Sequence, residues 1–122
     1  MILVDTSIWV DHLRSHLPAL GDLLDNANVL GHPWVTGELA LGTMAQRDVI
    51  LGLLANLPQA AVATPDEVLT MVQVHRLHGR WIGYVDAQLL ASTLLTTGAR
   101  LWTGDRRLAG IATELGVATV GS

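Results

Sequence analysis

The sequence predicts an α/β fold, in which a parallel β-sheet lies between two layers of helices (α/β/α). Short, fully apolar runs alternate with amphipathic segments along the chain, which is typical of strands buried on both faces by helices. The length of 122 residues suits one domain, so we expect residues 1–122 to form a single unit. Half of the residues are apolar, which excludes disorder as the main state.

The N-terminal half predicts two strands and four helices. The apolar run 2–4 predicts a buried strand, and Asp5-Thr6-Ser7 directly after it predicts a helix cap. Residues 7–13 are expected to be helical, because Trp9 and Leu13 have the i,i+4 spacing of one helix face. The further elements that we expect are a helix at 17–26, a short strand at 28–31, a helix that begins at Pro33 and ends near Gly42, and a helix at 48–56.

The C-terminal half contains the clearest local signal, a capping box at Thr64-Pro65-Asp66-Glu67. This motif predicts a helix that continues to about His78 and ends at Gly79. The elements expected after it are a helix that begins at Asp86 and ends at Gly98, a strand at 101–103, a helix that is capped by Asp105 and ends near Gly116, and a last strand at 118–120.

The composition excludes several kinds of chemistry. The chain contains no Cys and no Lys, so thiol catalysis, thiolate metal sites, Schiff bases and a Walker-A lysine are excluded. A net charge of −4 disfavours binding of nucleic acid through a broad basic face and leaves room for a local basic patch. Asp5 interrupts the apolar start, and no apolar run reaches the roughly 20 residues of a membrane span, so we expect a cytoplasmic protein without a membrane segment.

Acidic residues follow the ends of two predicted strands. Asp5 comes directly after the first strand, and Asp105 comes shortly after the strand at 101–103. Because ligand sites in parallel sheets form beyond the carboxyl ends of the strands, we expect both side chains at one edge of the sheet. Asp86 and Glu38 lie on predicted helices that could bring them to the same edge. Four carboxylates would then share one pocket.

Such a pocket predicts a bound divalent cation or retained protons. Two like charges about 4 Å apart repel by roughly 4 kcal/mol at an effective dielectric constant near 20. Ligands that are all oxygen atoms suit Mg²⁺ or Mn²⁺ rather than Zn²⁺, and such ions activate water for attack on a phosphodiester. The simpler interpretation is that each Asp only caps a helix and that Glu38 is a solvated helix residue. Against it, Glu38 lies among Val35, Leu39 and Leu41, where an unpaired charge is costly.

These residues together resemble a known family. Asp5-Thr6-Ser7, the Glu38–Gly42 segment Glu-Leu-Ala-Leu-Gly, Asp86-Ala87, and the 101–108 segment Leu-Trp-Thr-Gly-Asp-Arg-Arg-Leu resemble a PIN domain, and more narrowly a VapC-type toxin of a toxin–antitoxin pair. The resemblance covers essentially the whole chain. It implies an α/β/α endoribonuclease that depends on Mg²⁺ or Mn²⁺, cuts structured RNA such as tRNA or rRNA, and leaves 5′-phosphate and 3′-hydroxyl ends.

The resemblance also implies roles for individual residues. The metal-binding and catalytic acids would be Asp5, Glu38, Asp86 and Asp105, accompanied on the substrate side by the hydroxyls of Thr6, Ser7 and Thr103. Some PIN nucleases carry a further acid shortly after the last Asp, where this chain has Arg106 and Arg107, so one or two metal ions remain open. These two arginines are expected either to contact phosphate or to be simply solvated.

Partners follow from the same resemblance. It implies a homodimer and a VapB-type antitoxin whose C-terminal segment lies over the active site. Trp9 and Leu13 could form a groove for an antitoxin helix, and the segment 80–84 could contact RNA at the entrance of the site.

Two other functions are weighed against a nuclease. A phosphatase or receiver that uses Asp5 as nucleophile would require an acid at position 7 or a late lysine, and the chain has Ser7 and no lysine. A non-catalytic PIN-like module that only binds RNA or protein would not need to keep four mutually repelling acids.

Overall fold

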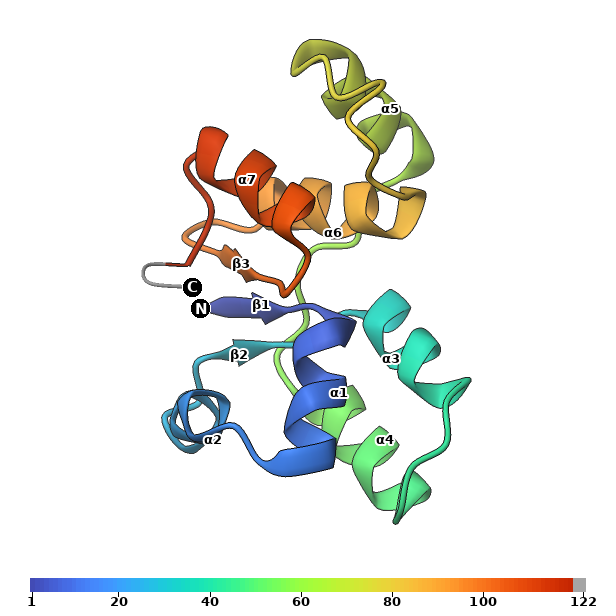
Figure 1. Cartoon of the computed structure of the whole chain (residues 1–122), viewed down its shortest axis with the longest axis vertical. Helices are drawn as coiled ribbons and strands as arrows, with labels where there is room; N and C mark the ends of the chain where they lie inside the picture. Colours follow the sequence, from blue (N-terminus) through green and yellow to red (C-terminus); the bar gives the residue numbers. More distant parts are fainter. Residues whose placement is uncertain (120–122) are drawn as a thin grey trace.

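The computed structural model describes residues 1–119 and contains a parallel three-stranded sheet. The strands are β1 (Ile2–Val4), β2 (Val29–Leu30) and β3 (Arg100–Trp102), in the order β2-β1-β3. Ile2 pairs with Val29 on one side and with Arg100 on the other, so β1 is the central strand (Figure 1). The predicted fold class is therefore confirmed.

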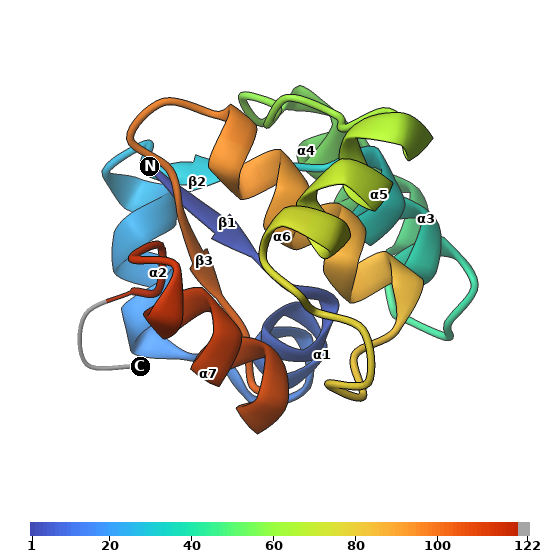
Figure 2. The ribbon, with the colours of Figure 1, turned by 90° about the horizontal axis from the view of Figure 1, so that it is seen from above.

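Seven helices within residues 1–119 surround this sheet. They are α1 (Thr6–Ser15), α2 (Pro18–Asp25), α3 (Pro33–Ala40), α4 (Arg47–Asn56), α5 (Pro65–Val74), α6 (Tyr84–Leu95) and α7 (Arg106–Glu114). Figure 2 shows α1, α2 and α7 on one side of the sheet and α3 to α6 on the other, which is the expected α/β/α arrangement. Among the described residues, none of these helices has both the length and the apolar character that spanning a membrane requires.

The helix α6 is the most deeply buried helix in the described part of the chain. Each residue from 87 to 93 is buried, and Leu89 and Leu90 have no exposed surface. The helix packs between α5 and the strand β3, which explains why most residues of its buried stretch are apolar or small. Its N-terminus, which carries Asp86, is thereby fixed relative to the sheet.

Several helix boundaries differ from the sequence prediction by a few residues, and those of α5 and α6 bear on the site. The helix α6 begins at Tyr84, so Asp86 is its third residue rather than its first, and Gly83 is the N-cap. The helix α5 has the predicted capping box at Thr64, but it ends at Val74 rather than at His78. A left-handed Arg76 (φ 54°) turns the chain immediately after it.

The predicted last strand is reduced to a bridge in the described residues. Ala118 forms an isolated parallel bridge with Leu101, and Thr119 N–H donates to the carbonyl of Leu101. Val120, the last residue of the predicted strand, lies outside the described residues.

Candidate active site

Asp5 lies at the carboxyl end of the central strand and is the N-cap of α1. One carboxylate oxygen accepts the N–H of Thr6 at 2.7 Å. The other accepts the hydroxyl of Thr103 at 2.6 Å and the hydroxyl of Ser7 at 3.3 Å. Asp5 is buried, so these donors replace the water that a carboxylate would otherwise bind. Its position and orientation are therefore fixed by its neighbours.

Thr103 connects Asp5 to Asp105 across the edge of the sheet. While its hydroxyl donates to Asp5, it also accepts the backbone N–H of Asp105 at 3.1 Å. Asp105 caps α7, since its Oδ1 accepts the N–H of Leu108 at 2.9 Å. Asp5 and Asp105 therefore lie at the same edge of the sheet, as their positions after strand ends predicted.

A second bond connects the same two loops. The N–H of Gly104 donates to Ser7 Oγ at 3.1 Å. A side chain at residue 104 would crowd this contact, because a Cβ atom there would lie 3.3 Å from Ser7 Oγ. Glycine is the residue that permits this approach.

Glu38 reaches the site from α3. Its Oε1 accepts the hydroxyl of Thr6 at 2.6 Å, which joins α3 to the start of α1. The expectation that apolar neighbours surround Glu38 was wrong: the carboxylate is exposed, Val35 and Leu39 are turned into the core, and Leu41 is in solvent. The cost of burying its charge is therefore no argument for a function, whereas its bond to Thr6 places it at the site.

Asp86 is half-buried at the first turn of α6. Burial raises the pKa of its carboxyl above the ordinary value, the N–H of Gly83 at 3.3 Å opposes this rise, and the neighbouring charges of three acids add to it. Those acids are Asp5, Asp105 and Glu38. The charges of the other three acids predicted from sequence therefore reach Asp86.

The donor set fits a hard divalent cation. Among residues 1–119, no group of three His, Cys, Asp or Glu side chains is already arranged as a metal site. However, Glu38 Oε2, Asp86 Oδ1 and Asp105 Oδ2 accept no hydrogen bond from any described residue, so each of these three acids has an oxygen available. Oxygen ligands of this kind suit Mg²⁺ or Mn²⁺, and a cation would offset the repulsion that, after burial, contributes to the raised pKa of Asp86.

Arg106 and Arg107 form the first turn of α7, next to Asp105. Both are exposed, and neither forms a salt bridge with any residue that the structure describes. They are therefore free to contact an anion, which is one of the two interpretations that the sequence left open.

Sequence reasoning missed a buried histidine that joins α3 to α6. His32 is the N-cap of α3: its Nδ1 accepts the N–H of Trp34 at 3.0 Å, and its Nε2 lies 2.9 Å from Ser92 Oγ. Since Nδ1 is the acceptor, Nε2 carries the proton and donates to Ser92, which in turn donates to Gln88. Burial lowers the pKa of His32 and keeps it neutral. The network fixes α3, and with it Glu38, against the helix of Asp86.

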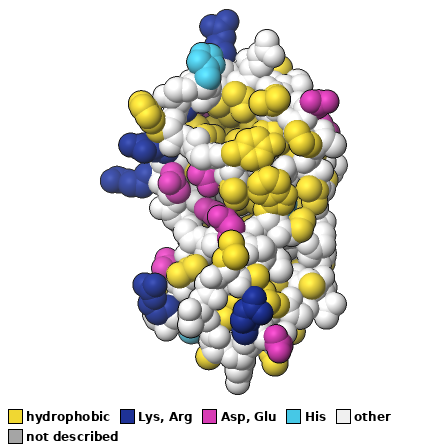
Figure 3. All heavy atoms as spheres, turned by 90° about the vertical axis from the view of Figure 1, so that its right-hand side faces the viewer, with side chains coloured by type: hydrophobic (Ala, Val, Ile, Leu, Met, Phe, Trp, Pro, Cys, Tyr) yellow, Lys and Arg dark blue, Asp and Glu magenta, His cyan; other side chains and the backbone are white. Residues whose placement is uncertain are grey.

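A cleft adjoins the acids. It has a volume of about 520 Å³, and Thr6 and Glu38 line it together with Val10, Leu13 and Ile50. On the face in Figure 3, acidic side chains lie together next to a broad apolar area. The cleft thus reaches the site at Thr6 and Glu38.

Sequence comparison relates the chain to two curated ribonucleases. No model of a known protein family matches the chain. Ribonuclease VapC32 of Mycobacterium tuberculosis is similar to it, both in strain CDC 1551 / Oshkosh and in strain ATCC 25618 / H37Rv. Each of these curated relatives is 55% identical over 118 residues, which is 97% of this chain and 95% of the relative.

Proposed function

Because the chain belongs to the VapC family of toxin ribonucleases, we propose that its four clustered carboxylates are the catalytic centre of a metal-dependent endoribonuclease. The acids are Asp5, Glu38, Asp86 and Asp105. The observation that carries this proposal is the hydrogen-bond geometry: Thr103 joins Asp5 to Asp105, and Thr6, next to Asp5, donates to Glu38. Burial of Asp86, with smaller contributions from the charges of the other three acids, raises the pKa of its carboxyl, which agrees with this arrangement.

Mg²⁺ or Mn²⁺ is the cofactor that this donor set would hold. Asp5, Asp86 and Asp105 would bind the ion, and Glu38 would bind it directly or through water. The chemistry that such an ion supplies, when bound, is activation of water and neutralisation of negative charge on the phosphodiester.

The hydroxyl groups position the acids in this account. Thr103 and Ser7 donate to Asp5, and Thr6 donates to Glu38, so each holds a carboxylate in a set direction. These hydroxyls would therefore position the acids in addition to making the substrate contacts that the sequence resemblance implied. Arg106 and Arg107, being exposed and without a salt bridge among the described residues, would contact phosphates of the RNA.

The substrate would be structured RNA such as tRNA or rRNA. Cleavage by attack of water on phosphorus would leave 5′-phosphate and 3′-hydroxyl ends. Few cations are available, so binding should depend weakly on salt, with about two to four phosphate contacts per chain.

The partner would be a VapB-type antitoxin. An apolar groove of about 320 Å³ runs along α1 and α4, lined by Trp9, Leu13, Leu53 and Leu57 among others. Trp9 forms its buried floor, and Leu13 and Leu53 are exposed at its rim, which suits an apolar helix of the antitoxin. Residues 1–122 would form one PIN domain that acts as a homodimer, and the continuous hydrophobic core of the described residues supports a single domain.

Variants that remove one charge at a time test the site. Asp5→Asn, Glu38→Gln, Asp86→Asn and Asp105→Asn should each abolish or strongly reduce cleavage of total tRNA and rRNA while the protein stays folded. Asp66→Asn is the matched control, since Asp66 is exposed in the first turn of α5 and away from the cluster. Full activity of a folded Asp5→Asn protein would refute the assignment.

A further inference from the structure

The exposed aromatic side chains gather beside the acid cluster. The aromatic residues of the chain are Trp9, Trp34, Trp81, Tyr84 and Trp102. Trp9 is buried and Trp102 is half-buried against the core, as packing residues should be. Trp34, Tyr84 and Trp81 are instead 38%, 46% and 80% exposed. Trp34 lies on α3, which carries Glu38, while Tyr84 begins α6, which carries Asp86, and Trp81 lies in the loop just before it.

Trp34 and Tyr84 contact each other across α3 and α6. Their ring centroids are 5.7 Å apart, and the ring planes are inclined by 46°. Trp34 precedes Glu38 by four residues, so it lies on the same side of α3 and about 6 Å away along the helix axis. Tyr84 precedes Asp86 by two residues. The aromatic pair is therefore within about one helical turn of two of the four acids.

Trp81 extends this pair along the loop between α5 and α6. Its backbone is left-handed (φ 65°), which is unusual for a bulky residue, and its side chain is mostly in solvent. Trp81 and Tyr84 line the same hollow of about 250 Å³. We call Trp34, Tyr84 and Trp81 the aromatic rim.

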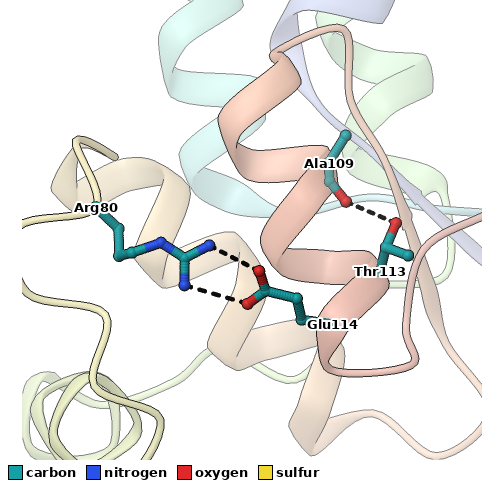
Figure 4. A network of polar contacts seen from close by, with 4 residues as sticks. All are labelled: Arg80, Ala109, Thr113 and Glu114. Atoms are coloured by element: carbon teal, nitrogen blue, oxygen red, sulfur yellow. Dashed lines mark hydrogen bonds and ion pairs between the residues drawn. The ribbon is translucent and has the colours of Figure 1, made fainter.

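The loop that carries Trp81 is attached to α7. The guanidinium of Arg80 donates two hydrogen bonds to the carboxylate of Glu114, at 2.9 and 3.1 Å (Figure 4). At the other end of the rim, the backbone N–H of Trp34 donates to Nδ1 of the buried His32. The rings are thus presented on anchored backbone rather than on a free tail.

Charge alone gives this protein little affinity for RNA. The chain has only seven Arg residues, no Lys and a net charge of −4, and four of its carboxylates lie at the site itself. Stacking of a base on an aromatic ring needs no cation, and it strengthens binding by a factor of about 5 to 150 per base. Because every base has a π face, this contact tolerates many sequences but requires a base that is unpaired.

We propose that the aromatic rim stacks unpaired bases of the RNA strand that the acid cluster cuts. The proposal deepens the function proposed above and rests on it for the identity of the substrate. It makes Trp34, Tyr84 and Trp81 positioning residues that hold unpaired bases of the substrate next to the acids.

The test measures binding separately from cleavage. The Asp5→Asn protein, which does not cut the RNA, is titrated in Mg²⁺ into a fluorescein-labelled oligoadenylate of about twelve nucleotides, and anisotropy is recorded. Adding Trp34→Leu should weaken binding by about 5- to 150-fold. Trp34→Phe, which restores an aromatic face, should stay within about threefold of the parent. An abasic oligonucleotide with the same phosphates should bind weakly and should not respond to Trp34→Leu.

Other results would overturn the proposal. Equal affinity of the Trp34→Leu and parent proteins for the oligoadenylate would refute stacking, and so would an equal loss on the abasic oligonucleotide. A change of oligomeric state in light scattering, without loss of RNA binding, would assign the rim to a protein interface instead. If wild-type protein cuts no RNA while the binding pattern is as expected, the catalytic proposal fails and the aromatic rim stands.

Discussion

Replacing Thr103 by Val tests how the site is held together. The substitution keeps the shape of the side chain and removes the hydroxyl that donates to Asp5 at 2.6 Å and accepts from Asp105 N–H at 3.1 Å. Thr103 and Asp5 are both buried, so water does not readily replace either bond. We expect loss of stability and loss of activity together.

The two bonds give the magnitude. A hydrogen bond to a charged acceptor contributes about 1.5–3 kcal/mol and a neutral one about 0.5–1.5 kcal/mol, so Thr103→Val should lower the free energy of unfolding by about 2–4 kcal/mol. For a chain of 122 residues this corresponds to a fall in Tm of about 8–16 °C. Because Thr103 orients two of the proposed metal ligands, kcat/KM should fall by about 10- to 100-fold.

Urea unfolding in EDTA, together with RNA cleavage in Mg²⁺, checks this prediction. Thr113→Val is the matched control: the Thr113 hydroxyl donates to the carbonyl of Ala109 on the exposed face of α7, away from the acids (Figure 4). It should change stability by less than about 0.5 kcal/mol and leave cleavage unchanged. A Thr103→Val protein as stable and as active as this control would refute the view that Thr103 holds the two acids.

Three further predictions follow from charges and titrating groups. Asp86→Asn should stabilise the metal-free protein at neutral pH by about 1 kcal/mol or more, since like charges near the surface repel by that order. Because the pKa of Asp86 is raised in the folded state, wild type should lose stability as pH rises through that pKa. Urea unfolding should show this loss for wild type and not for the variant. The pKa of His32 is lowered in the folded state, so wild type should lose stability as pH falls from about 6.5 through that pKa. The His32→Gln protein should be less stable than wild type at pH 7.5 and should not show this loss at lower pH. A wild-type free energy of unfolding that stays constant as pH falls below about 6.5 would contradict this prediction for His32. Arg80→Met should have the same Tm as wild type within the error of calorimetry, because the ion pair of Arg80 with Glu114 is exposed. A large fall in Tm would show that the loop needs this ion pair for folding.

Topology made part of the site predictable from sequence. Strand ends in a parallel sheet share one edge, so the short apolar strands alone indicated that Asp5 and Asp105 would be neighbours. The helix after Thr64 was predicted because a capping box is a purely local signal.

Other features depend on contacts that the local pattern does not encode. Periodicity indicated a helix around Glu38 but not which side of it would face the core, so the surroundings of Glu38 were predicted wrongly. The start of α6 was missed because its N-cap is Gly83, which has no side chain to mark it. The bond between His32 and Ser92 joins residues 60 positions apart, and only the folded chain reveals it.

The central claim is that four carboxylates hold a divalent cation for RNA cleavage, and the most direct test is the metal dependence of that cleavage. Purified wild-type protein, free of antitoxin, is incubated with total tRNA and rRNA in Mg²⁺, in Mn²⁺ and in EDTA, with folded Asp5→Asn as the contamination control. We predict discrete fragments with 5′-phosphate ends in Mg²⁺ or Mn²⁺ and none in EDTA or with the variant. Equal cleavage in EDTA, or by Asp5→Asn, would contradict the account.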